Sequence, residues 1–218
     1  MPELLIFYKR LITHYGSRDW WPAETPFEVI LGAILTQNTN WNNVEKAIAN
    51  LRQADALTLD SILCLDREAL EQLIRPSGFF RQKAERLQLF CSHIREQHNG
   101  SLDHLFDQEL DIVREELLSL KGIGPETADS ILLYAGQRLS FVVDAYTNRL
   151  FGRLGIFSGT EKYDEIRALF MDNLPREISL YNEYHALIVL HCKEFCRKTP
   201  RCQGCPCGDI CLERQQNC

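Results

Sequence analysis

Residues Leu120–Arg149 read LKGIGPETADSILLYAGQRLSFVVDAYTNR, and this stretch decides how the rest of the chain is interpreted. Gly122 and Gly124 lie in a short connection between two segments whose apolar residues have helical spacing. Glycine can adopt a positive φ, and Pro125 suits the first turn of a helix. Exposed amides beside a helix N-terminus form an anion site, so the stretch predicts a phosphate contact. The alternative is a tight helical hairpin whose glycines only permit the turn.

A single carboxylate follows the hairpin, since Asp144 stands in the otherwise apolar run FVVDA. It precedes a segment, residues 146–154, that we predict to be helical, so it can serve as a helix cap. A carboxylate held in a dry site can also stabilise positive charge that develops in a reaction, or activate a water molecule. The capping role and the chemical role are compatible.

Helical spacing of apolar residues extends over nearly the whole sequence, and no segment shows sustained strand alternation. Thr25-Pro26-Phe27-Glu28 has the pattern of a capped helix start with a capping box, a second helix is expected after Asn40, and Asp66 is a further expected cap. The fold class is therefore predicted to be all-α, with room for two helical lobes. Helices are expected at 27–35, after 40, after 66, and at 81–97, 109–120, 126–136, 146–154, 162–173 and 180–195.

Composition and charge limit the classes of function. The 218 residues carry a net charge of −6, which argues against a nucleic-acid partner unless phosphate is bound by a local cluster or by backbone amides. The apolar runs are shorter than the ~18 residues that cross a bilayer, and the N-terminus has no signal-peptide pattern. We therefore expect a cytoplasmic protein of bacterial or archaeal type that does not enter membranes.

Cysteines are concentrated near the C-terminus. Six of the nine lie between Cys192 and Cys211, a clustering that indicates a metal rather than disulfides. Four of them have the spacing C-x5-C-x2-C-x5-C, which suits a [4Fe–4S] cluster or a zinc ion. These four candidate ligands are Cys196, Cys202, Cys205 and Cys211.

The hairpin, VVD at 142–144, Asn148-Arg149 and the cysteine spacing together resemble the endonuclease III superfamily of DNA glycosylases, from Phe27 to Cys211. The resemblance implies a six-helix domain at 24–136 and a cluster domain made of residues 1–23 and 137–218, with a cleft between them. It also implies a monomer that acts on double-stranded DNA, associates with the nucleoid and favours [4Fe–4S] over zinc. The first cysteine gap is one residue shorter than the family pattern, so Cys192 and Cys207 are possible substitute ligands.

The same resemblance implies roles for the hairpin residues. It makes Asp144 the catalytic carboxylate and assigns the DNA backbone to the hairpin turn, Lys121, Gly122, Ile123 and Gly124. Family members that also nick the strand carry a lysine two residues after the second hairpin glycine, where it forms a Schiff base. Here that position is Glu126. We therefore predict a monofunctional glycosylase that uses water as the nucleophile, with lyase activity absent or weak.

Within the superfamily, the segments WWP, LGAILTQNT, RPSGF, QKA and VVDAY resemble the 3-methyladenine glycosylase branch. That likeness implies that Trp20-Trp21-Pro22 and Trp41 sandwich the flipped base, although tryptophans at such positions can also serve packing alone. A cationic alkylated purine is attracted to aromatic faces and carries a weakened glycosidic bond. Gln37 matches the residue that, in endonuclease III itself, enters the gap left by the flipped nucleotide, and Phe79 is the candidate wedge. The alternatives are a polar residue at a helix C-terminus for Gln37 and a satellite hydrophobic contact for Phe79.

These features predict a base excision repair enzyme that removes alkylated purines, 3-methyladenine foremost. One alternative is an endonuclease III-like glycosylase with AP lyase activity on oxidised pyrimidines or mismatched bases. Another is a non-catalytic DNA-binding or redox-sensing iron–sulfur protein.

Overall fold

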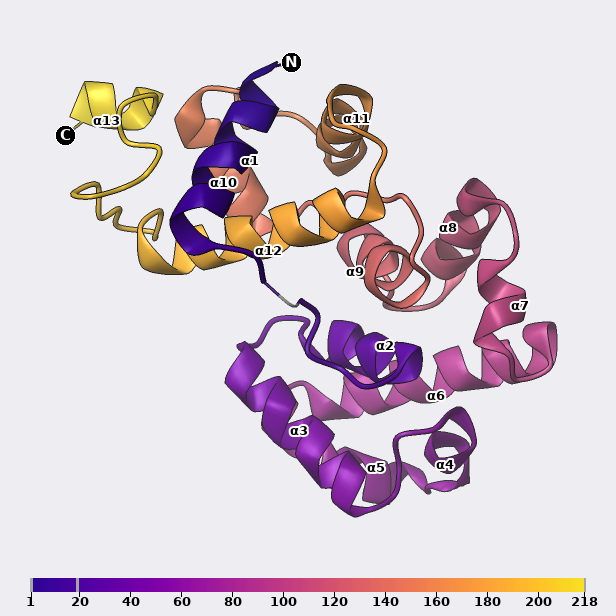
Figure 1. Ribbon diagram of the computed structural model, residues 1–218. Coiled ribbons are helices and arrows are strands. Elements are labelled where there is room, and N and C mark those ends of the chain that lie inside the picture. The colour runs from indigo at the N-terminus through magenta and orange to yellow at the C-terminus, as the bar shows by residue number, and fades with distance from the viewer. Residues whose placement is uncertain (1, 19, 218) are drawn as a thin grey trace. The chain divides into compact units, whose positions relative to one another are not determined.

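The computed structural model describes residues 2–18 and 20–217, and over these residues it contains helices and no strand (Figure 1). The predicted all-α class is confirmed. The chain divides into two compact units, one of residues 21–138 and the other of residues 1–20 with 139–218. No helix among the described residues is long and apolar enough to span a membrane.

The unit of residues 21–138 is built around α2 (Pro26–Leu35), which is buried from Phe27 to its last residue. Thr25 caps α2 by accepting a hydrogen bond from the Glu28 amide at 3.1 Å. The expected capping box takes a different form, because the Glu28 carboxylate accepts from the Glu24 amide, at 3.1 Å. The unit's other elements are α3 (Trp41–Gln53), α4 (Leu59–Cys64), α5 (Arg67–Leu73), η1 (Arg75–Ser77), α6 (Phe80–His98), α7 (Leu102–Phe106), α8 (Leu110–Ser119), α9 (Pro125–Ser130) and η2 (Ile131–Ala135).

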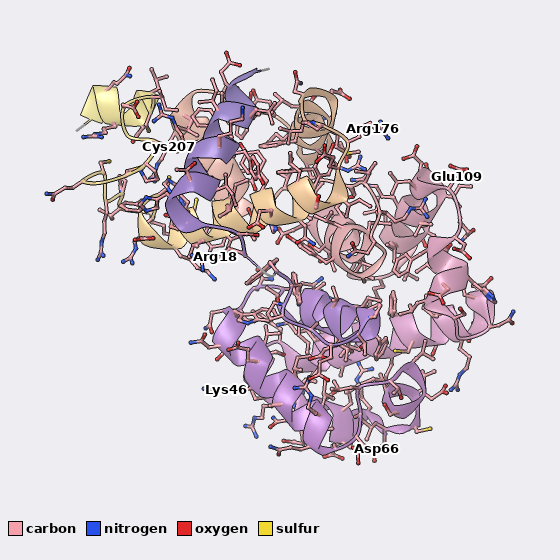
Figure 2. All side chains as sticks on the ribbon, viewed as in Figure 1. Arg18, Lys46, Asp66, Glu109, Arg176 and Cys207 are labelled. Carbon is pink, nitrogen blue, oxygen red and sulfur yellow. The ribbon has the colours of Figure 1, made fainter. Side chains whose placement is uncertain are left out.

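Two further caps are present in this unit, and Asp66 is the one that was predicted. The side chain of Asn40 accepts from the Asn43 amide at 3.2 Å and starts α3. The side chain of Asp66 accepts from the Ala69 amide at 2.7 Å and starts α5 (Figure 2). The sequence pattern did not predict the short helices α4 and α7, because five or six residues hold too little periodicity to reveal a face.

The second unit combines both ends of the chain. Its elements are α1 (Pro2–Tyr15), α10 (Ala145–Leu154), α11 (Tyr163–Asn173), α12 (Ile178–Glu194) and α13 (Leu212–Asn217). Its core is aromatic: Phe141 stacks on Phe170 with ring centroids 4.1 Å apart, and Phe151 packs edge-on against Phe170 at 4.9 Å. The buried Tyr184 hydroxyl donates to the Leu4 carbonyl at 2.7 Å, which fixes α1 against α12.

The cysteine-rich segment between α12 and α13 is also joined to α1. Arg10 donates to the Pro206 carbonyl at 3.0 Å and forms a two-point ion pair with Asp209. Cys207, which is labelled in Figure 2, lies between these two partners in sequence and is buried. The N-terminal helix is therefore part of the fold of the cysteine-bearing unit.

Candidate active site

Asp144 occupies the N-cap of α10 and presents its two carboxylate oxygens to different partners. Oδ1 accepts from the Thr147 amide at 2.7 Å and from the Thr147 hydroxyl at 3.0 Å. Oδ2 lies 3.5 Å from Nε2 of His185, which projects from α12. Burial raises the pKa of Asp144, but the contacts with His185 and Thr147 outweigh it, so the pKa falls below its usual value. The predicted cap is confirmed, and the carboxylate is ionised at neutral pH.

The predicted glycine hairpin joins α8 to α9. Gly122 has φ +86°, a left-handed conformation that favours glycine. Gly124 precedes α9, and a Cβ added there would meet nothing within 4 Å, so this side of the turn is open. The adjacent Lys121 is largely exposed, and its Nζ lies 2.5 Å from a carboxylate oxygen of Glu85. The turn therefore presents backbone on an open face with a lysine beside it.

A buried ion pair clamps the two hairpin helices together. Arg114 of α8 donates from Nε and Nη2 to the two carboxylate oxygens of Asp129 in α9, at 2.9 and 3.1 Å. Asp129 is fully buried, so the pair is shielded from water. Sequence reasoning missed the pair because its members are fifteen positions apart, which matches no local helical spacing.

Gln37 links the end of α2 to the hairpin. Its amide nitrogen donates to the Gly122 carbonyl at 3.0 Å and to the Thr127 hydroxyl at 2.9 Å. Its amide oxygen accepts from Arg86. In this structure both ends of the Gln37 amide are therefore bonded within the protein. To fill a gap in a duplex, as predicted, Gln37 would exchange these partners for the orphan base.

The loop before α6 exposes an apolar side chain in a strained conformation. Phe79 is 62% exposed and has φ +46°, an uncommon value for a bulky residue. The loop is held from beneath by Lys83, whose buried Nζ donates to the Ser77 carbonyl at 2.7 Å and to the Leu35 carbonyl at 2.8 Å. Burial, followed by the nearby Arg86 charge, lowers the pKa of Lys83 to about 8. A rigid loop with an exposed phenylalanine is the geometry expected of a wedge.

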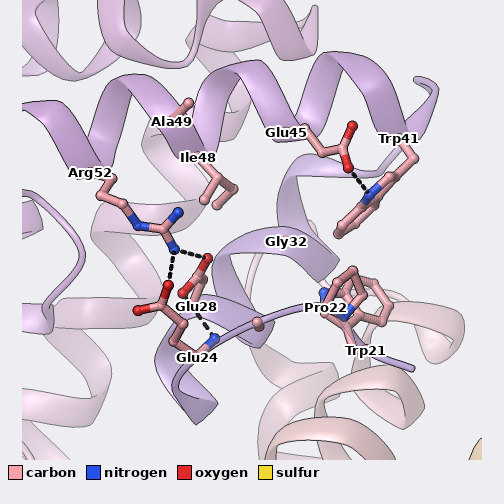
Figure 3. Close-up of a pocket in the computed structure, with 11 residues that line it drawn as sticks. Trp21, Pro22, Glu24, Glu28, Gly32, Trp41, Glu45, Ile48, Ala49 and Arg52 are labelled. Carbon is pink, nitrogen blue, oxygen red and sulfur yellow. Dashed lines mark hydrogen bonds and ion pairs between the residues drawn. The ribbon is translucent and has the colours of Figure 1, made fainter. Parts of the chain in front are cut away.

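A cavity of about 390 Å³ opens between α3 and the segment before α2 (Figure 3). Trp21, Pro22 and Trp41 line it, as do residues that sequence reasoning missed. The two indoles meet edge to face, with ring centroids 5.2 Å apart and planes at 88°. The missed lining residues are Ala23, Glu24, Glu28, Gly32, Glu45, Ile48, Ala49 and Arg52. Trp20 belongs to the other unit and does not line this cavity.

Two contacts fix the indoles in place. The indole nitrogen of Trp41 donates to a carboxylate oxygen of Glu45, one turn further along α3, at 2.9 Å (Figure 3). Trp21 lies against Gly32 of α2, where an added Cβ would come within 3.0 Å of its indole nitrogen. The perpendicular indoles leave no parallel slot for a planar base, so a base held between them requires one ring to rotate.

The cysteine-rich segment holds thiols of two kinds. Cys192 and Cys207 are buried, and burial raises the pKa of Cys207 to about 12. Cys196 accepts from Arg153 at 3.4 Å, and hydrogen bonds from Cys192 and Arg153 lower the pKa of Cys196 to about 6. Cys211 lies 3.6 Å from the Arg153 carbonyl. A thiolate beside an arginine, in a segment with partly exposed thiols, suits the soft-donor chemistry of an iron–sulfur cluster or zinc.

Comparison with known proteins points in one direction. Residues 31–176 match the HhH-GPD superfamily of base excision DNA repair proteins. A protein of Methanocaldococcus jannaschii with the provisional name of DNA repair glycosylase is 53% identical over 209 residues, which cover 95% of this chain and 94% of that protein. Endonuclease III of Synechocystis is 30% identical over 217 residues, covering 98% and 92% of the two chains.

Solved structures agree with the sequence relatives. The H. pylori 3-methyladenine DNA glycosylase bound to 1,N6-ethenoadenine is 34% identical, with a TM-score of 0.75 and coverage of 88% of this chain and 96% of that one. Endonuclease III in a non-covalent complex with DNA is 22% identical, with a TM-score of 0.84 and coverage of 99% and 96%. The latter likeness shows that the helical fold is shared.

Proposed function

The chain belongs to the HhH-GPD superfamily of base excision DNA repair proteins, and we propose that this DNA repair glycosylase is monofunctional and releases alkylated purines from duplex DNA. The observation that carries the choice of substrate is the cavity in which Trp21 and Trp41 stand beside the carboxylate of Glu45. Alkylation at N3 or N7 makes a purine cationic. A cationic base is attracted to the faces of indoles and to a carboxylate more strongly than a neutral base is.

The size and polarity of the cavity support this choice. About 390 Å³ is within the range of small-molecule sites and accommodates a purine. Rotation of one indole from the perpendicular arrangement would let a flipped base stack. The H. pylori relative binds 1,N6-ethenoadenine, an enlarged adenine, which supports a purine as the occupant.

Asp144 would supply the chemistry at the sugar. Breaking an N-glycosidic bond builds positive charge on the sugar, and an ionised carboxylate in a dry site stabilises it. Thr147 holds one oxygen in place, and the other, which lies beside His185, would face the reacting groups. The same carboxylate can orient or deprotonate the attacking water, as expected for a reaction without a covalent enzyme intermediate.

The DNA-facing elements would be the hairpin turn, Gln37 and Phe79. Backbone amides at Gly122 and Gly124 suit a phosphate, while the exposed ring of Phe79 can enter the base stack. Because backbone amides can supply local anion contacts, a net charge of −6 is compatible with binding double-stranded DNA as a monomer.

Cys196, Cys202, Cys205 and Cys211 would hold the [4Fe–4S] cluster that endonuclease III homologues typically carry, with zinc as the alternative. When bound, the group would cross-link the segment between α12 and α13 and leave the bond-breaking step to Asp144. Arg153 would fix the backbone around it, since it donates to the carbonyls of Arg197 and Lys198 at 2.6 and 2.9 Å.

A base-release assay tests the choice of substrate. Duplexes with 3-methyladenine, an oxidised pyrimidine or a mismatch would be incubated with the full chain, and free base would be measured. Release of 3-methyladenine, reduced by Trp41→Ala but not by the exposed control Lys46→Met, is expected. Release of the oxidised pyrimidine alone would instead favour the second candidate, an endonuclease III-like activity, which the relatives at about 30% identity support.

Borohydride trapping on an abasic-site duplex tests the monofunctional assignment. Glu126 stands where a lyase lysine would be, so no covalent adduct is expected from the unmodified chain. A Glu126→Lys variant provides the positive comparison, because it places an amine at that position. An adduct from the unmodified chain would overturn the assignment and leave the glycosylase activity in place.

A further inference from the structure

Three potential metal ligands converge in the unit of residues 21–138, outside the groups described above. His93 and His98 come from α6, and Glu116 comes from α8. The Nε2 atoms of both histidines lie 2.5 Å from the same carboxylate oxygen, Oε1 of Glu116. All three ligand atoms lie within 4.8 Å of one another. We propose that these side chains form a binding site for a divalent transition-metal ion of the zinc class, a proposal independent of the base that the enzyme removes.

The donor set and its spacing suit such an ion. Two imidazoles and one carboxylate, with water in a fourth position, form a recurrent zinc coordination set. Each histidine nitrogen lies 2.5 Å from Oε1 of Glu116. Bonds of ~2.0 Å at tetrahedral angles put donor atoms ~3.3 Å apart, so each of these nitrogen-to-oxygen separations would need to grow by less than ~1 Å to admit the ion.

The surroundings orient the ligands and favour a cation. The side-chain amide of Gln108 donates to Oε2 of Glu116 at 3.3 Å, which turns Oε1 toward the histidines. His98 is the last residue of α6, where the helix dipole favours positive charge. His93 and Glu116 are partly exposed, which leaves a route for an ion and a water.

The position of the site gives it a structural role. Glu116 lies three residues before the end of α8, and the hairpin turn follows directly. A bound ion would tie α8 to α6 just ahead of the turn that includes Gly122. Occupancy of the site should therefore raise the thermal stability of the unit that presents the hairpin.

Metal binding can be measured on the purified full chain with Zn²⁺ alone as the probe. Elemental mass spectrometry after gel filtration should give one equivalent of zinc fewer for His93→Gln than for the unmodified chain. Zn²⁺ should raise the melting temperature of the unmodified chain more than that of His93→Gln. His104→Gln is the matched control, since His104 is an exposed histidine of the neighbouring α7, and it should bind as the unmodified chain does.

Co²⁺ distinguishes this site from the cysteine-rich segment. The difference between the Co²⁺ spectra of the unmodified chain and His93→Gln should contain visible d–d absorption. It should lack the thiolate-to-cobalt charge-transfer absorption that cysteine ligands produce. Glu116→Gln, which keeps the shape of the side chain, should lose the same cobalt absorption. This second variant tests whether the loss in His93→Gln comes from the missing ligand rather than from a folding defect. Equal zinc content, melting shift and cobalt spectrum in the unmodified chain and both variants would overturn the site and leave a hydrogen-bonded His–Glu cluster.

Discussion

Asp144 caps α10, and its proposed chemical role is compatible with the cap because its two oxygens have different partners. Oδ1 is occupied by the amide and hydroxyl of Thr147, whereas Oδ2 faces His185. An asparagine at this position can still offer an oxygen to the Thr147 amide. The cap and the chemistry can therefore be separated by one substitution.

Asp144→Asn is expected to lower the rate of base release by about 10²- to 10⁴-fold, because it removes the charge that stabilises the sugar cation. Single-turnover release measures the rate, while circular dichroism and a DNA-binding titration test folding and affinity, which should persist. The exposed Asp172→Asn is the control. Unchanged release by Asp144→Asn would favour a non-catalytic DNA-binding protein.

Lys83 should make the stability of the fold depend on pH. Its pKa is about 8 in the folded chain, against 10.5 for an unperturbed lysine. Between these values the unfolded chain binds a proton that the folded chain does not, so this group makes the free energy of unfolding rise with pH. Below about pH 8 both states hold this proton, so Lys83 no longer makes the free energy of unfolding depend on pH.

Urea unfolding at several pH values between about 8 and 10.5 checks this dependence. Lys83→Met should be less stable throughout, by about 1–3 kcal/mol, because the Ser77 and Leu35 carbonyls lose a buried donor. The stability difference between the unmodified chain and the variant should widen as pH rises. If the stability difference for Lys83→Met instead stays constant with pH, as is expected for the exposed control Lys46→Met, the lowered pKa is contradicted.

Among the elements, the hairpin depends on more than its glycines. Gly122 allows the turn, and the Arg114–Asp129 pair fixes the helices on both sides of it. Asp129→Asn should destabilise the chain by about 3–5 kcal/mol, because it removes the negative charge that faces the largely buried guanidinium of Arg114. Chemical denaturation measures the loss.

The double variant Arg114→Met/Asp129→Leu separates charge burial from packing. Replacing both partners with apolar side chains should recover much of the stability lost by Asp129→Asn. If Asp129→Asn alone is as stable as the unmodified chain, the pair does not hold the hairpin.

Helix α3 brings Trp41 and Glu45 to one face, since they are separated by one turn. Glu45→Gln keeps an acceptor for the Trp41 indole but removes the negative charge. Release of cationic 3-methyladenine should therefore fall several-fold more than release of neutral 1,N6-ethenoadenine. The comparison of the two rates is the measurement, and an equal effect on both bases would remove the charge from the specificity argument.

On the scale of the whole molecule, one unit unites α1 with the C-terminal cysteine segment through Arg10 and the core contact of Tyr184. Loss of a proposed cysteine ligand should therefore lower the stability of this whole unit. Cys202→Ser is expected to reduce iron content and lower the melting temperature, whereas the buried Cys207→Ala should retain iron. Iron analysis with a visible spectrum checks this, and equal iron loss in both variants would place Cys207 among the ligands.

The sequence by itself determined the all-α class, the helix caps at Thr25, Asp66 and Asp144, the helix that follows Asn40, and the hairpin. These features depend on the spacing of apolar residues and on local hydrogen bonds within a few positions, which are visible along the chain. The family resemblance grouped Trp20, Trp21, Pro22 and Trp41 as a predicted base pocket, and all of these except Trp20 line one cavity.

The tertiary structure alone decided which distant side chains meet. His185 beside Asp144, Arg114 with Asp129, and the three ligand atoms of His93, His98 and Glu116 have no signature in the sequence. His93 and His98 are five positions apart, ~140° around a regular helix, so periodicity gives no reason to pair them. Such contacts arise from the packing of one helix on another, and that packing depends on the summed burial of the core rather than on any local pattern.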